Sequence, residues 1–171
     1  MELLFGKGAV LHPKRPLSQP GQFLSEERVT LIGPKGKKER VAVLGPVRKA
    51  TQVELSISDC VALGIKAPVR ESGDLRDAGP VIIEGPKGTL DASSAVIVAR
   101  AHVHVPPQAA AKLDLQDKER VSVQIMTERP VTFDNVVIRV SDQFRYKMHI
   151  DFDEANAAQV SGFTLGKILK Q

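Results

Sequence analysis

The sequence predicts a mainly β protein built from two related β units, and three observations support this expectation. Short apolar segments typical of strands recur along most of the 171 residues, with turn residues between them. Two turns of identical sequence each follow such a segment, and two helix ends resemble one another. Helical patterns are short and few. We therefore expect sandwich or barrel sheets rather than a helical fold or one parallel sheet with crossover helices.

Seven segments have the composition of β-strands. In the segment 120–125, three apolar residues (Val121, Val123 and Ile125) alternate with two polar ones, which is the period-two pattern of a strand buried on one side. The other six segments are 28–32, 40–44, 51–55, 81–84, 95–98 and 135–140. This spacing of short strands is what predicts the sheet type.

Three short helices are expected, at 56–63, 107–113 and 153–160. The first begins with a capping pattern, in which Ser56 precedes Asp59 by three positions, and Gly64 ends it. The second begins at Pro107 and is rich in alanine. Helices of this length are expected to cap the sheets.

Two internal repeats suggest that the two β units are related. The turn Gly33-Pro34-Lys35-Gly36 returns as Gly85-Pro86-Lys87-Gly88, and each suits a hairpin because proline fixes φ and glycine accepts unusual angles. A hairpin with an exposed lysine is the simpler interpretation, and contact with phosphate or a coenzyme is the alternative. The second repeat joins a helix to a strand, as Leu63-Gly64-Ile65 and as Leu113-Asp114-Leu115.

The composition is that of a soluble protein with a packed core. Hydrophobic residues make up 42% of the chain, no apolar run approaches the roughly 20 residues of a membrane span, and no signal peptide is visible, so we expect a cytoplasmic protein without a membrane partner. The single cysteine, Cys60, is interpreted as a core residue. The net charge of +4 favours anionic partners, while the aromatic content of 4% disfavours nucleic acid.

Two of the four histidines, His102 and His104, are separated by one residue and follow an apolar strand. In an extended segment both rings point to the same face and can address one metal ion. His149 is the natural third ligand, because zinc needs three or four converging ligands. Incidental surface residues, and a hydrogen-bonded structural histidine at 149, are the competing interpretations. His12 has no neighbours that indicate a role.

Glu54 and Arg48 are the charged residues of interest in the first half. Glu54 lies in a strand between two apolar residues, where a cation partner or a solvent-facing position would explain it equally well. Arg48 precedes that strand, and its planar guanidinium suits the oxygens of a phosphate. An exposed charge in a loop is the simpler interpretation of Arg48.

Several motifs taken together resemble the propanediol-utilisation type of phosphotransacylase (phosphate propanoyltransferase). No single motif is decisive, but the match runs in order from about residue 3 to residue 156. The motifs are Gln19-Pro20-Gly21-Gln22-Phe23, Gly33-Pro34-Lys35-Gly36, Gly45-Pro46-Val47-Arg48-Lys49-Ala50-Thr51-Gln52-Val53-Glu54, Ala67-Pro68-Val69-Arg70-Glu71-Ser72-Gly73-Asp74-Leu75, His102-Val103-His104 and Met148-His149-Ile150-Asp151.

This resemblance implies two small β-barrels with short capping helices, in a protein that is usually dimeric and has two zinc ions between the barrels. We expect residues 1–99 to form the first barrel and residues 100–171 most of the second. In the matching motifs, His102, His104, His149 and Glu54 fall on metal-ligand positions, and Arg48 falls on the phosphate-contacting position.

The chain also departs from the family pattern. The family carries an Arg-His-Val-His segment upstream of the Leu-Phe-Gly stretch, with two more metal-ligating histidines and a strand of the second barrel, whereas this sequence begins at Met1. Ala101 stands where the family usually has an arginine. The four remaining ligands suffice for one tetrahedral zinc, so we expect one zinc, a more open sheet edge and low turnover.

The implied activity is a zinc-dependent phosphate acyltransferase. It would convert propanoyl-CoA or acetyl-CoA and phosphate to acyl phosphate and coenzyme A, with zinc as Lewis acid and template and Arg48 holding the phosphate. The resemblance also implies a homodimer and association with a bacterial microcompartment. The alternative functions are a truncated or degenerate, non-catalytic β-barrel binding module, a basic nucleic-acid-binding barrel and an acyl-CoA hydrolase.

Overall fold

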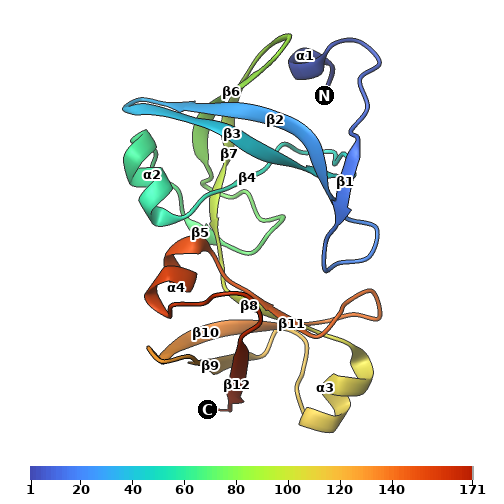
Figure 1. Ribbon diagram of the computed structural model, residues 1–171, viewed down its shortest axis with the longest axis vertical. Helices are drawn as coiled ribbons and strands as arrows, with labels where there is room; N and C mark the ends of the chain where they lie inside the picture. The colour runs from blue at the N-terminus through green and yellow to red at the C-terminus, as the bar shows by residue number, and fades with distance from the viewer. Residues whose placement is uncertain (171) are drawn as a thin grey trace. The chain divides into compact units, whose positions relative to one another are not determined.

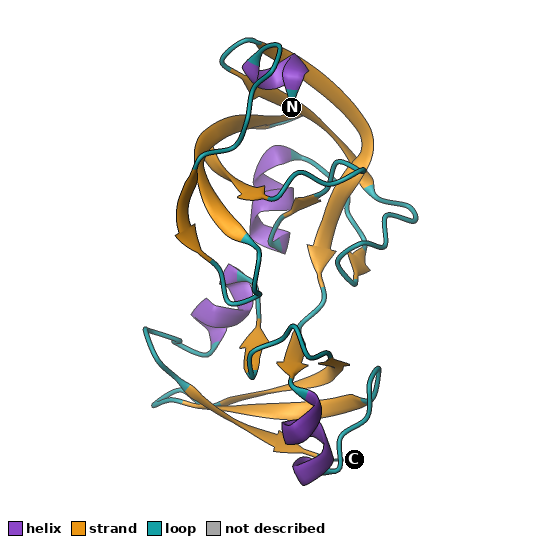
Figure 2. Cartoon of the chain, turned by 90° about the vertical axis from the view of Figure 1, so that its right-hand side faces the viewer, coloured by secondary structure: helices purple, strands orange, loops and turns teal. Residues whose placement is uncertain are grey.

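The computed structural model describes residues 1–170, which form two compact units, Met1–Val98 and the residues from Ala99 onward (Figure 1). Each unit has an apolar core of its own. The helices in the described residues have only four to seven residues, and strands make up most of the regular structure (Figure 2). The prediction of a mainly β fold with short helices is therefore confirmed. Within residues 1–170, no helix is long and apolar enough to cross a membrane.

The first unit is one branched sheet of seven strands with two short helices. The strand order is β1-β2-β6-β7-β4, with β3 paired to β2 and β5 paired to β7. Its core contains the almost fully buried side chains of Leu31, Leu63 and Val96. The elements are α1 (Glu2–Phe5), β1 (Pro13–Pro16), β2 (Phe23–Gly33), β3 (Gly36–Gly45), β4 (Val53–Glu54), α2 (Ile57–Leu63), β5 (Val69–Arg70), β6 (Gly79–Gly85) and β7 (Gly88–Ala99).

The two repeated turns close the hairpins β2–β3 and β6–β7, so the simpler interpretation of both turns is confirmed. Each turn also contacts the end of a short helix in the same way. The backbone N–H of Lys35 donates to the carbonyl of Leu63 at the end of α2, and the N–H of Lys87 donates to the carbonyl of Leu4 in α1, both at 3.0 Å. The repeat in sequence is thus a repeat in structure, a hairpin docked on a helix.

Only glycine fits at the first position of these turns. A Cβ atom on Gly33 would lie 2.3 Å from the carbonyl oxygen of Leu63, and one on Gly85 would lie 2.4 Å from that of Leu4. Real Cβ atoms do not approach backbone this closely, so a larger residue would push the helix off the hairpin.

The second unit is a five-stranded sheet with two short helices. The strand order is β11-β8-β10-β9-β12; β8 runs parallel to β10 and antiparallel to β11. Its core contains Val105, Val121, Val136 and Ile138, all of them fully buried. The elements are β8 (His102–Val105), α3 (Pro107–Leu113), β9 (Arg120–Met126), β10 (Val131–Val140), β11 (Lys147–His149), α4 (Phe152–Ala157) and β12 (Leu165–Leu169).

The repeated helix ends at Gly64 and Asp114 have the same backbone geometry. Both residues adopt the left-handed conformation, with φ of 73° and 51°, and both donate their N–H groups to carbonyls of the last helical turn. The following residues, Ile65 and Leu115, donate back to Cys60 and Ala110 respectively. This pattern satisfies carbonyls that a helix end otherwise leaves without partners. Cys60 is buried, as predicted.

The third predicted helix, which is α4 of the structure, differs from its predicted bounds. It spans Phe152–Ala157 rather than 153–160, and it begins with a capping box between Asp151 and Glu154. It ends early because Gln159 has a φ of 50°, which no right-handed helix can include. The sequence pattern also did not indicate α1, β1 or β12. All four residues of β1 are exposed, so this strand has no apolar periodicity to detect.

His12, which had no predicted role, pairs with Glu27 on β2. The ring Nδ1 lies 2.6 Å from a carboxylate oxygen of Glu27, and the backbone N–H of His12 donates to both oxygens. The hydrogen bond to this carboxylate raises the pKa of His12 above its usual value. Although burial opposes it, the hydrogen bonds from His12 lower the pKa of Glu27 to about 2. The pair attaches the loop before β1 to the sheet.

Candidate metal centre and anion site

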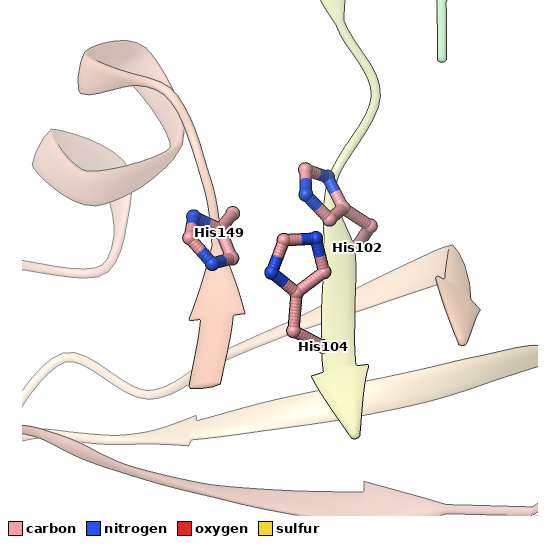
Figure 3. Close-up of side chains that lie close together, drawn as sticks. All are labelled: His102, His104 and His149. Carbon is pink, nitrogen blue, oxygen red and sulfur yellow. The ribbon is translucent and has the colours of Figure 1, made fainter. Parts of the chain in front are cut away.

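Three of the four histidines come together in the second unit (Figure 3). His102 and His104 lie two residues apart on β8, so both side chains point to one face of the sheet. His149 ends the neighbouring strand β11, where it is the register partner of His102. One potential ligand atom from each ring lies within 4.8 Å of the other two.

The three rings are packed against each other in a definite arrangement. The rings of His102 and His149 are stacked, with centroids 4.9 Å apart and planes 6° from parallel. The ring of His104 is tilted by 51° and 52° to these two rings, at centroid distances of 4.8 and 4.4 Å. One nitrogen from each ring can therefore lie near the same small space.

The orientation of His102 follows from one hydrogen bond. Its Nδ1 lies 2.8 Å from the carbonyl oxygen of Arg100, and because a carbonyl only accepts, Nδ1 must carry the hydrogen. Nε2 is then the ring nitrogen of His102 that could coordinate a metal ion. A backbone carbonyl behind a ligating histidine is a common way to fix the ring and its tautomer.

Burial keeps the other two histidines neutral. It is the main reason that the pKa of His104 falls to about 3 and that of His149 to about 4, and the positive charges of neighbouring histidines and of Arg139 act in the same direction. Neutral imidazole is the form that binds a metal ion. Both rings are therefore ready for coordination at neutral pH.

The donor set fits a metal ion. Nε2 of His104 and Nε2 of His149 are buried and have no hydrogen-bond partner among residues 1–170. Leaving a buried polar atom without a partner costs about 1–3 kcal/mol, and a bound cation would remove this cost. Zinc with bonds of about 2.0–2.1 Å holds its nitrogens about 3.4 Å apart, so the three ligand atoms, which lie within 4.8 Å of one another, would have to move somewhat closer to bind it.

The predicted residues of the first unit, Arg48 and Glu54, both line a cavity of about 320 Å³ within that unit. Most of the cavity wall is apolar and includes Val29, Leu31 and Val43. Both charged side chains are exposed. The cavity thus combines an apolar wall with one cationic and one anionic group.

The carboxylate of Glu54 is oriented by Gln52, a residue that the sequence did not single out. The amide nitrogen of Gln52 donates to Glu54 at 2.6 Å and lies 2.9 Å from the hydroxyl of Ser72, while its oxygen accepts from the N–H of Gly73 at 2.8 Å. The loop around Ser72 therefore fixes the amide, and the amide fixes the carboxylate. Gln52 lies inside a motif of the family resemblance, which was the available signal.

The structure thus divides the predicted site residues between the units. His102, His104 and His149 belong to the second unit and form a histidine cluster, whereas Arg48 and Glu54 belong to the first unit and share one cavity. The three histidines of this cluster, of which His104 is buried and the other two are partly buried, could hold a metal ion.

Comparison with known proteins identifies the family. The family model for phosphate propanoyltransferase matches residues 1–161. A phosphate propanoyltransferase of Clostridioides difficile (strain 630) is 47% identical over 171 residues, which are 100% of this chain and 82% of that protein. Those of Listeria monocytogenes and Thermotoga maritima are 45% and 46% identical, over 100% and 94% of this chain and 80% and 77% of their own lengths. The chain belongs to the phosphate propanoyltransferase family, and it is an acyltransferase.

Proposed function

We propose that this chain exchanges phosphate and coenzyme A on a short acyl group in a zinc-dependent reaction. An oxygen of phosphate forms a bond to the thioester carbonyl carbon of propanoyl-CoA or acetyl-CoA. The carbon–sulfur bond breaks, and the thiolate of coenzyme A leaves with the electron pair and takes up a proton. The observation that carries the proposal is the histidine cluster, in which two buried nitrogens lack partners among residues 1–170, in a member of this family.

The histidine cluster is proposed to hold the zinc ion, and the carboxylate of Glu54 is proposed as a further metal ligand. Zinc takes three or four nitrogen, sulfur or oxygen ligands from a protein, so one ion is expected. When bound, zinc supplies a Lewis acid that polarises an oxygen of the substrate. The bond from Gln52 to Glu54 supports this role, because it holds the carboxylate in one orientation before any ligand arrives.

Arg48 is proposed to bind the phosphate. Its guanidinium can donate two parallel hydrogen bonds to phosphate oxygens, which both orients the anion and neutralises part of its charge. The apolar wall of the cavity that Arg48 lines would exclude water from that side. Positioning and electrostatics then account for catalysis, and no covalent intermediate on the protein is needed.

The remaining expectations about assembly and location are part of the same proposal. Acyl-CoA, phosphate and free coenzyme A are the expected small-molecule partners. A homodimer in the cytoplasm, associated with a bacterial microcompartment, is the expected context.

A thiol-release assay tests the reaction itself. With propanoyl-CoA and zinc-loaded protein, release of free coenzyme A should require phosphate, and acyl phosphate should accumulate in equal amount. Release that is independent of phosphate would identify a hydrolase instead. If zinc-loaded protein released no thiol, the non-catalytic binding module would be the better description.

Replacing Arg48 tests the phosphate site. Arg48→Ala should raise the KM for phosphate or lower turnover by an order of magnitude or more, because a hydrogen bond to a charged group contributes about 1.5–3 kcal/mol. Lys49→Ala is the matched control, since it removes a positive charge from the next exposed position. Equal phosphate kinetics in both variants would contradict the role of Arg48.

A further inference from the structure

The ring of Phe144 lies flat against the ring of His104. The two centroids are 3.8 Å apart and the planes differ by only 4°. Phe144 lies between β10 and β11, in the segment that connects Arg139 to the strand of His149. It is outside every motif that pointed to the site, yet it makes the closest ring contact of the histidine cluster.

His102 and His104 are oriented by different means. The ring of His102 donates a hydrogen bond to the carbonyl of Arg100, whereas Nε2 of His104 has no partner among the residues the structure describes. His104 is 4% exposed, so neighbouring side chains enclose its ring. The flat contact with Phe144 restricts rotation of that ring, because turning it would drive its edge into the phenyl face.

Phe144 is itself held in place by a charge. The guanidinium carbon of Arg139 lies over the phenyl ring at 5.8 Å from its centroid, which is within the range of a cation–π contact. Arg139 is the register partner of His104 on the neighbouring strand β10. The sheet therefore fixes Arg139, Arg139 attracts Phe144, and Phe144 covers the face of His104.

We propose that Phe144 is a positioning residue that holds the imidazole of His104 with Nε2 directed into the histidine cluster. This inference rests on the proposed metal centre. Its consequence is that part of the metal affinity resides in a side chain that cannot itself bind metal. Groups that orient a ligand typically change metal affinity by about 10–100-fold when they are removed.

The test is a zinc titration against a competing chelator. Phe144→Leu keeps an apolar side chain but removes the flat ring, and it should weaken zinc binding by about tenfold or more. Phe144→Tyr keeps a flat ring and should bind zinc nearly as tightly as the wild type. Phe163→Leu is the matched control, because it makes the same change at a 91% exposed phenylalanine of the same unit, and its affinity should be unchanged.

A second readout separates positioning from folding. In the metal-free protein, the carbon-bound ring protons of His104 should show the upfield NMR shift of a stacked aromatic ring, and this shift should vanish in Phe144→Leu while the thermal unfolding midpoint stays near that of the wild type. If Phe144→Leu did not fold, Phe144→Met would provide the same comparison.

Two results would overturn the inference, and only one of them would also refute the proposed metal centre. Wild-type zinc affinity in Phe144→Leu, beside normal zinc binding by the wild type, would refute the role of Phe144 and leave the proposed function intact. Absence of zinc binding in the wild type itself would refute the metal centre and the inference with it.

Discussion

The repeated turns of the first unit and the histidine cluster of the second unit differ in how their buried polar groups are partnered. In each turn, a backbone N–H that packs against a helix end meets a carbonyl at 3.0 Å. In the histidine cluster, two buried ring nitrogens meet no partner in the described part of the chain. Both features are short motifs in the sequence, so a motif alone does not show whether its residues have a structural or a chemical role.

The presence or absence of hydrogen-bond partners for the buried polar groups does distinguish a structural motif from a chemical one. A buried group that is fully bonded within the chain contributes to stability and has nothing left to offer a ligand. A buried group without a partner lowers stability, and its presence calls for another explanation such as an unseen ion. By this criterion the repeated turns are structural, and the histidine cluster, the proposed metal centre, is a place where two unpartnered nitrogens lower stability.

The largest effect on stability is expected in a repeated turn, and it tests whether the turns are structural. Gly33→Ala places a Cβ atom 2.3 Å from the carbonyl oxygen of Leu63, so it should lower the free energy of unfolding by about 1–3 kcal/mol. Gly36→Ala, at the other end of the same turn, is the control, because its Cβ would lie 3.4 Å from the nearest carbonyl oxygen. Chemical denaturation of both variants gives the comparison. Equal stabilities would show that the hairpin is not docked as described.

A smaller effect, an unchanged or slightly higher stability, is expected when a residue of the histidine cluster is replaced. His104→Leu removes a buried nitrogen without a partner, which costs about 1–3 kcal/mol, while it also loses ring stacking worth about 0.5–1.5 kcal/mol. The metal-free variant should therefore be as stable as the wild type, or more stable by about 1 kcal/mol. Denaturation in the presence of a chelator measures this. A large loss of stability would mean that His104 is a structural histidine.

Local signals in the sequence predicted much of the fold. The ends of α2 and α3 were predictable because Gly64 and Asp114 follow short helical patterns, and the hairpin turns because proline and glycine restrict the backbone there. The end of α4 was not, because nothing in the local pattern shows that Gln159 reverses the chain. Strand β1 was missed because it is exposed throughout and because its pairing with β2 is not visible in the local sequence.

The site was predictable to a smaller extent. The spacing of His102 and His104 placed both rings on one face, which depends only on strand geometry. The position of His149 beside them depends on the pairing of β11 with β8, a contact between distant parts of the chain that no local pattern specifies. Phe144 and Gln52 were not singled out because they act through other side chains, and such roles exist only in three dimensions.

Zinc affinity compared between two histidine substitutions tests the central claim most directly. His149→Leu removes a ring of the histidine cluster, and His12→Leu makes the same change at the histidine that pairs with Glu27 instead. Titration against a chelator should show zinc binding by the wild type and by His12→Leu with equal affinity. His149→Leu should bind at least about 100-fold more weakly, since losing a ligand costs more than losing a group that orients one. Equal affinity of His149→Leu and the wild type would show that the histidine cluster is not the metal centre.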